Sequence, residues 1–206
     1  MSDEKRRVLL TGANGLVGQK LVKLLRNRPA LELLATSRGE NRMLDTEGFD
    51  WLSLDIASRE ELAAVFRDFQ PTEVINSAAM TQVDACETDP DNCRAINTTA
   101  VQYMTELCRE HDSRLLHIST DFIFDGEQGP YKEDDEPNPL SIYGQSKLDA
   151  ERIILESGIR AAILRTVLVY GFVEGLGRSN IVLWVRKSLK EGQDIKVVDD
   201  QFRSPT

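Results

Sequence analysis

The sequence has 206 residues, 41% hydrophobic and 29% charged, with a formal net charge of −9. This length fits one large domain, or one domain and part of a second. The acidic balance argues against nucleic acid or an anionic membrane as the main partner, because both need a basic surface. No apolar run approaches the roughly 20 residues of a membrane span. The three cysteines match no metal-ligand spacing, so we expect reduced thiols in a cytoplasmic protein without a metal site.

Strand and helix patterns alternate along the chain. The strand patterns cover residues 7–11, 31–36, 51–54, 73–78, 114–119 and 160–169, with a short one near 195–198. The helix patterns cover residues 16–26, 60–69, 91–111, 141–156 and 179–191. This alternation predicts a doubly wound α/β fold of the Rossmann type, with helices on both faces of a parallel sheet. Ligands of such folds bind at the carboxyl ends of the strands.

The first predicted strand leads directly into the run TGANGLVG, where the glycines Gly12, Gly15 and Gly18 recur at every third position. The first glycine permits a tight turn, the second lets a pyrophosphate approach the backbone, and the third lets helix and strand pack closely. The free N–H groups at the helix start then face the phosphates. Because the motif follows a strand and opens a helix, it predicts a dinucleotide site rather than a plain turn.

The end of the second predicted strand indicates which dinucleotide binds. An acidic residue there would hold the ribose 2′-hydroxyl of NAD, whereas an arginine would accommodate the 2′-phosphate of NADP. The sequence has Ser37 and Arg38 at this point, with Arg42 close by, and arginine offers forked donors that suit a phosphate. We therefore expect NADPH, with NADH as the alternative. Residues after the third and fourth strands are expected to line the cofactor: Asp55, Ile56, Ala78, Ala79 and Met80.

A proton-transfer centre is predicted beyond the fifth strand. Thr120 lies at the carboxyl end of that strand, and Tyr143 and Lys147 follow at positions i and i+4 of a predicted helix. Residues four apart share one helix face, so a lysine ammonium would lower the pKa of the tyrosine from about 10. The Thr120 hydroxyl would hydrogen-bond a substrate oxygen. The alternative is a surface Tyr–Lys pair, and His117 in the fifth strand is interpreted as a core residue.

Three segments carry a family resemblance: STDFIFDGEQGPYKEDDEPNPLSIYGQSKLDAE, LRTVLVYG and DDQFRSPT. They resemble the extended short-chain dehydrogenase/reductases, and among these the dTDP-4-dehydrorhamnose reductases. The resemblance implies reduction of a 4-keto group on a dTDP-hexose. Tyr143 would donate a proton to the carbonyl oxygen, Lys147 would bind the nicotinamide ribose, and Thr120 would orient the carbonyl. The residues implied to meet the pyrophosphate are Gly15, Leu16 and Val17.

The resemblance also implies a substrate side. Asp121, Asn180 and Arg203 would contact the nucleotide sugar, and Asn97 resembles an asparagine that shapes the floor of the active site. Leu168 stands where the bacterial reductases have a tryptophan that meets the substrate. The resemblance therefore implies a nucleotide-sugar substrate, and this position leaves the identity of the sugar open.

Residues 1–170 are expected to form the NAD(P)-binding domain, and residues 171–206 to begin a substrate-binding region that is incomplete. Dimers are common in the family, so a homodimer is expected from the resemblance. The sequence does not indicate which residues would form the interface. Two other functions stay open. One is a nucleotide-sugar epimerase or dehydratase on the same fold. The other is a non-catalytic NADP-binding regulatory subunit, because the regulatory subunit of methionine adenosyltransferase resembles the same family.

Overall fold

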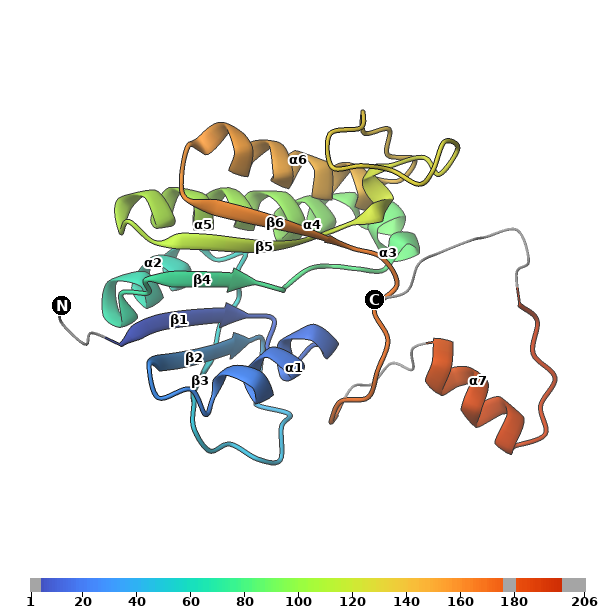
Figure 1. Cartoon of the computed structure of the whole chain (residues 1–206), viewed down its shortest axis with the longest axis horizontal. Coiled ribbons are helices and arrows are strands. Elements are labelled where there is room, and N and C mark those ends of the chain that lie inside the picture. The colour runs from blue at the N-terminus through green and yellow to red at the C-terminus, as the bar shows by residue number, and fades with distance from the viewer. Residues whose placement is uncertain (1–4, 176–180, 198–206) are drawn as a thin grey trace.

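The computed structural model describes residues 5–175 and 181–197, and its centre is a six-stranded sheet (Figure 1). The strand order is β3-β2-β1-β4-β5-β6, and each neighbouring pair is parallel. The strands are β1 (Arg6–Thr11), β2 (Leu31–Ser37), β3 (Asp50–Ser53), β4 (Glu73–Asn76), β5 (Arg114–Thr120) and β6 (Ala161–Thr166). The predicted doubly wound α/β fold is confirmed, with the switch in strand order between β1 and β4.

Helices cover both faces of this sheet (Figure 1). They are α1 (Leu16–Leu25), α2 (Arg59–Phe69), α3 (Val83–Thr88), α4 (Pro90–Arg94), the π-helical η1 (Ala95–Thr99), α5 (Ala100–Glu110), the 3₁₀ turn η2 (Asp121–Ile123), α6 (Ile142–Ser157) and α7 (Ile181–Lys190). None of the helices in these described ranges is long and apolar enough to cross a membrane.

Two hydrophobic clusters attach the helices to opposite faces. Leu9 of β1 and Leu115 of β5 belong to a cluster with residues of α2, α5 and α6. Leu10, the next residue of β1, belongs to the other cluster together with Val22 of α1. Successive side chains of a strand point to opposite faces, so β1 feeds both clusters and lies buried at the centre. Each fully buried leucine side chain contributes about 1.5–3 kcal/mol.

The structure corrects three details of the predicted element order. The short helix α3 was missed, because six residues are fewer than the window in which helical periodicity shows. The predicted helix over 91–111 contains the π-helical segment η1. The strand predicted near 195–198 is wrong for residues 195–197, which form no regular element, and Val198 lies outside the described residues. A strand needs a partner for its backbone groups, and the described sheet ends at β6 on this side.

The segment that follows β6 reaches beyond the sheet. Figure 1 shows α7 apart from the layered body, on the side where the strands end. The domain boundary between residues 170 and 171 stays a prediction.

Candidate active site

A large cavity of about 1480 Å³ opens at the carboxyl ends of the strands, and residues that end or follow all six strands line it. This is where ligands of a doubly wound sheet bind. The predicted residues that line it are Gly12, Gly15, Leu16, Val17, Gly18, Ser37, Arg38, Asp55, Ile56, Ala78, Ala79, Met80, Thr120, Tyr143 and Lys147. Asp121 is not among the lining residues, and Asn180 and Arg203 lie outside the described residues.

The glycine motif forms a tight loop between β1 and α1. Gly12 has a φ of +72°, in the left-handed region that favours glycine. A Cβ atom on Gly18 would lie 2.2 Å from the Gly12 carbonyl oxygen, so this helix start has no room for a side chain. The N-cap residue of α1, Gly15, supplies no side-chain acceptor, and the first turn holds no acidic residue. The N–H groups at this end are therefore suited to bind an external pyrophosphate.

Polar residues at and beyond the end of β2 line the cavity beside this loop. They are Ser37, Arg38 and Arg42. The Asn14 side chain fixes the following segment, since its Nδ2 donates to the Glu40 carbonyl (2.9 Å) and its Oδ1 accepts from the Arg42 amide (3.0 Å). The sequence pattern assigns no role to Asn14, which is one of the variable positions of the glycine motif. In the structure it supports the corner of the cavity that Arg38 and Arg42 line.

Thr120, Tyr143 and Lys147 meet on the other side of the cavity. Thr120 is the last residue of β5, and its hydroxyl accepts from the Phe122 amide (3.2 Å) and donates to the Asp121 carboxylate (3.2 Å). Tyr143 lies in the first turn of α6, where its ring meets Phe122 edge to face at 5.6 Å between centroids. Helix α6 therefore brings the phenol and the amine to the end of β5 as predicted.

The electrostatics of this centre differ from the sequence prediction. Burial raises the pKa of the Tyr143 phenol, and a hydrogen bond with Thr120 lowers it by less. The pKa of Tyr143 is therefore raised and not lowered, which contradicts the prediction. The Lys147 amine instead lies 2.9 Å from Nε2 of His117 and donates to the Ile118 carbonyl at 2.8 Å. Burial lowers the pKa of Lys147 to about 8, although the Glu151 carboxylate opposes this.

Two buried side chains beneath the cavity were not assigned to the site by the sequence. His117 is fully buried, as predicted for a core residue, but it contacts both Lys147 and Asn76. Burial and the neighbouring lysine hold the pKa of His117 well below its usual value of 6.5. Asn76 ends β4, so these contacts cross strands that are distant in sequence. No spacing rule could have linked them.

Asn97 connects the segment after β4 to helix α6. Its Oδ1 accepts from the Met80 amide (2.8 Å), and its Nδ2 donates to the Met80 carbonyl (3.0 Å) and to Oγ of Ser146 on α6 (3.1 Å). It lies in the π-helical η1, a type of distortion that is frequent at functional sites. Asn97 thus holds the segment after β4 against α6.

The strand predicted over 160–169 ends earlier, at Thr166. Val167, Leu168 and Val169 instead line the cavity. Leu168, which replaces the tryptophan of the resembling reductases, therefore lies where a ligand would pass.

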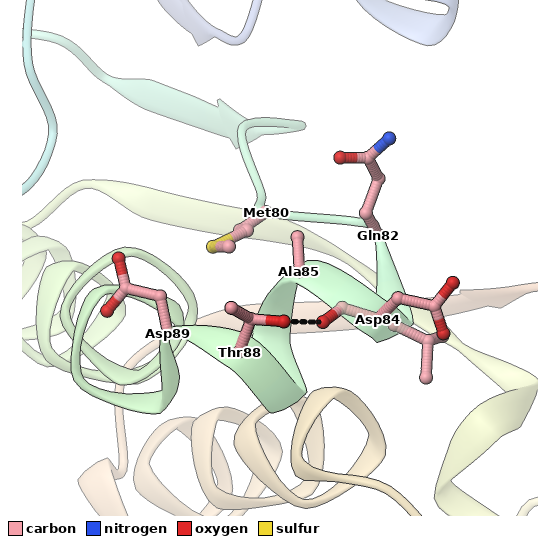
Figure 2. A pocket seen from close by; sticks show the side chains of 7 residues that line it. Met80, Gln82, Asp84, Ala85, Thr88 and Asp89 are labelled. Carbon is pink, nitrogen blue, oxygen red and sulfur yellow. Dashed lines mark hydrogen bonds between the residues drawn. The ribbon is translucent and has the colours of Figure 1, made fainter.

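A smaller cavity of about 670 Å³ adjoins the first beside α3 (Figure 2). The two share Met80, Gln82 and Val83. Figure 2 shows the Gln82 side chain projecting away from α3, while the Thr88 hydroxyl donates to the Asp84 carbonyl within that helix (2.8 Å). The shared residues make this hollow an extension of the large cavity along α3.

Comparison with known proteins identifies the family of the chain. A sequence profile described as "RmlD substrate binding domain" matches residues 6–206. The dTDP-4-dehydrorhamnose reductase of Aggregatibacter actinomycetemcomitans is 35% identical over 201 residues, which are 97% of this chain and 63% of that protein. Methionine adenosyltransferase 2 subunit beta of Xenopus laevis is 32% identical over 202 residues, 98% of this chain and 58% of that protein.

A solved structure agrees with these relatives. The dTDP-4-dehydrorhamnose reductase of Bacillus anthracis, in complex with NADP, aligns with a TM-score of 0.75 at 27% identity, covering 93% of this chain and 61% of that one. The chain spans less than two thirds of each of these relatives. The profile match, the sequence identity and the fold agree, and the chain belongs to the RmlD substrate binding domain family, within the extended short-chain dehydrogenase/reductases.

Proposed function

We propose that this chain is the cofactor-binding part of an NADPH-dependent reductase of a nucleotide-linked 4-keto sugar, of the dTDP-4-dehydrorhamnose reductase type. One observation carries the proposal: a single cavity contains the glycine loop, the arginine-lined corner and the three side chains of a proton-transfer centre. The relative from Aggregatibacter is named for this reaction, and the Bacillus anthracis structure contains NADP. A cytoplasmic location and a homodimer belong to the same proposal.

The residues of the cavity fit the cofactor in three places. The N–H groups at the start of α1 would hold the pyrophosphate, Ser37 and Arg38 would hold the 2′-phosphate, and Lys147 would bind the nicotinamide ribose. When bound, NADPH supplies a hydride for the carbonyl carbon of the substrate.

The chain's own side chains supply the proton. The Thr120 hydroxyl orients the substrate carbonyl, and the Tyr143 hydroxyl donates its proton to the carbonyl oxygen. A raised pKa suits this direction, because the phenol stays protonated in the cofactor-free protein. A positive charge on Lys147 then stabilises the phenolate that donation leaves behind.

A regulatory function is the second candidate. It is favoured by the similarity to methionine adenosyltransferase 2 subunit beta, which also aligns along nearly the whole of this chain. In that case the cavity would bind NADP without turnover. An epimerase would also use this fold, but it would keep its cofactor through the reaction.

NADPH oxidation by the full-length protein tests the proposal. The substrates are dTDP-, UDP- and GDP-linked 4-keto hexoses, and we expect turnover with at least one of them, highest for the dTDP sugar. NADPH binding without turnover on the whole panel would favour the regulatory function. Sugar interconversion by a protein that purifies with bound NAD would favour the epimerase.

A further inference from the structure

A line of buried polar side chains runs from β1 to α6 beneath the cavity. Thr11 Oγ1 donates to Asn76 Oδ1 (2.6 Å), Asn76 Nδ2 lies 3.0 Å from His117 Nδ1, and His117 Nε2 lies 2.9 Å from Lys147 Nζ. All four side chains are nearly inaccessible, and Lys147 is the most exposed at 2%. Buried polar groups find their partners within the protein, so donors and acceptors along this line must match.

The backbone fixes the orientation of Asn76. The Ala78 amide, which can only donate, lies 3.2 Å from Asn76 Oδ1. That atom is therefore the amide oxygen, and the NH₂ group of Asn76 faces His117. His117 Nδ1 must accept this hydrogen bond. A neutral imidazole carries one N–H group, so the proton of His117 is on Nε2. An imidazolium would also carry a proton on Nδ1, which would then face the NH₂ group of Asn76, donor against donor.

The Nε2 proton points at the amine of Lys147. An ammonium group has three donors and no acceptor, whereas a neutral amine has a lone pair that accepts. Lys147 uses one donor on the Ile118 carbonyl. We propose that His117 is a positioning residue that sets the protonation state of Lys147, because its Asn76-fixed tautomer donates to the lysine and favours the neutral amine in the cofactor-free protein. Burial acts in the same direction and lowers the pKa of Lys147 to about 8.

Other titratable groups near Lys147 do not remove this effect. Glu151 on α6 favours the ammonium, but it is engaged by Arg165 of β6 in an ion pair at 2.8 Å. Cys93 on α4 acts in the same direction on Lys147. Among the other titratable groups on elements packed against α6, Cys86 on α3 and Asp121 on η2 act on Tyr143. Glu87 on α3 accepts from the Ile142 amide at the start of α6, and Arg109 on α5 donates to the Ser157 carbonyl at its end.

The consequence for catalysis rests on the proposed function. The reaction needs an ammonium beside Tyr143, whereas the contact with His117 stabilises the neutral amine. Above pH of about 8, binding of NADPH would therefore take up a proton at Lys147. His117 would make the charge of the site depend on the cofactor.

Nitrogen NMR of the histidine rings in the cofactor-free protein tests the tautomer. The chain has two histidines, and a His111→Gln variant assigns their signals. We expect His117 to show the neutral form protonated on Nε2. A ring protonated on Nδ1, or on both nitrogens at neutral pH, would overturn the proposal.

The pKa of Lys147, followed by carbon NMR of labelled lysine side chains and assigned with Lys147→Arg, tests the coupling. His117→Gln adds no charge and offers an oxygen acceptor, so the pKa of Lys147 should rise by about one unit or more. Asn76→Asp should switch His117 to the Nδ1 tautomer and raise the same pKa. Ser113→Ala, which removes a buried hydrogen bond to the Pro71 carbonyl just before β5, is the matched control.

If His117→Gln or Asn76→Asp folds and its Lys147 pKa is unchanged, the inference is refuted. Neither measurement uses a substrate. Turnover together with failed NMR tests would refute only this inference. Passed NMR tests without turnover would refute only the proposed function.

Discussion

At the residue scale, the preference for one dinucleotide is assigned to the side chains that follow β2. Ser37, Arg38 and Arg42 line the cavity there, and Asn14 anchors the backbone between them. Asp55, which follows the neighbouring strand β3, is an acidic residue that also lines the cavity. Its Oδ1 accepts a hydrogen bond from the Ala57 amide (3.0 Å). The corner therefore presents donors to a 2′-phosphate.

Arg38→Ala should weaken NADPH binding about 10-fold or more, because charge-assisted hydrogen bonds contribute about 1.5–3 kcal/mol. NADH, which lacks the phosphate, should bind the variant nearly as well as the parent protein. Calorimetric titration with both cofactors measures the two affinities. Arg28→Ala is the matched control, since Arg28 is exposed in the turn before β2 and does not line the cavity. Equal losses for NADPH and NADH would contradict the assignment.

Residues of the site could be predicted where their relation is local in the chain. The glycine loop and the Tyr143–Lys147 pair are defined by spacing, and both lie in the cavity wall. Asn76 and His117 were not assigned to the site because their partners lie on other strands. The wrong expectation for the pKa of Tyr143 has the same origin, since sequence spacing does not show how deeply a phenol is buried.

At the element scale, the loop between β1 and α1 depends on backbone contacts that leave no space for side chains. A Cβ on Gly18 would overlap the Gly12 carbonyl oxygen, and one on Gly12 would lie 2.6 Å from the Ala78 amide. These contacts attach the start of α1 to β1 and to the segment after β4. The direction in which α1 presents its N–H groups follows from them.

Gly18→Ala should therefore displace the start of α1 and reduce NADPH binding at least 10-fold, with a stability loss of about 1–3 kcal/mol. Gly158→Ala is the comparison, since its Cβ would contact nothing within 4 Å but its φ is +72°. That variant should also lose stability, by about 1 kcal/mol, while it keeps its NADPH affinity. Cofactor titration and urea unfolding of both variants measure this. Unchanged NADPH affinity in Gly18→Ala would show that the loop does not bind the phosphates.

A buried ion pair joins α6 to β6. Arg165 donates to both carboxylate oxygens of Glu151, whose side chain is 1% exposed, and also to the Glu133 carbonyl (2.9 Å). The guanidinium lies 5.4 Å from the centre of the Phe124 ring. This arginine thus holds the loop before α6 against the sheet.

Arg165→Met should lower the free energy of unfolding by roughly 3 kcal/mol, because it leaves the Glu151 carboxylate buried without a partner. The double variant Arg165→Met/Glu151→Leu should recover much of this loss, since no charge is then left unpaired. Urea denaturation measures these differences in the free energy of unfolding, from the midpoints of variants whose unfolding free energy depends equally on urea concentration. A double variant less stable than Arg165→Met would contradict this account of the pair.

Elements were predictable where hydrophobic periodicity is long and regular, and less so elsewhere. All six strands of the sheet appear near their predicted positions. The π-helical η1 was missed because one extra residue per turn leaves no compositional mark, yet it carries Asn97, which binds the backbone of the lining residue Met80. The predicted strand end at residue 169 was wrong, since apolar residues 167–169 line a cavity instead of a core.

At the scale of the whole molecule, the doubly wound topology gathers these parts at one edge of the sheet. The phosphate loop follows β1, the arginine-lined corner follows β2, and Thr120 ends β5. Helix α6 then returns along the sheet and presents Tyr143 and Lys147 to the same cavity. One cavity is thereby lined by all of these parts within the described residues, and α7 lies beyond the strand ends (Figure 1).

The turnover of Tyr143→Phe tests the central claim most directly. This variant keeps the ring against Phe122 but loses the proton donor, so NADPH oxidation with a nucleotide 4-keto sugar should fall by about 10²–10⁴-fold. NADPH affinity should stay within about threefold of the parent protein, a difference worth less than 1 kcal/mol. Tyr103→Phe, on α5 and outside the cavity, should keep full turnover. Turnover of Tyr143→Phe equal to that of Tyr103→Phe would contradict the account.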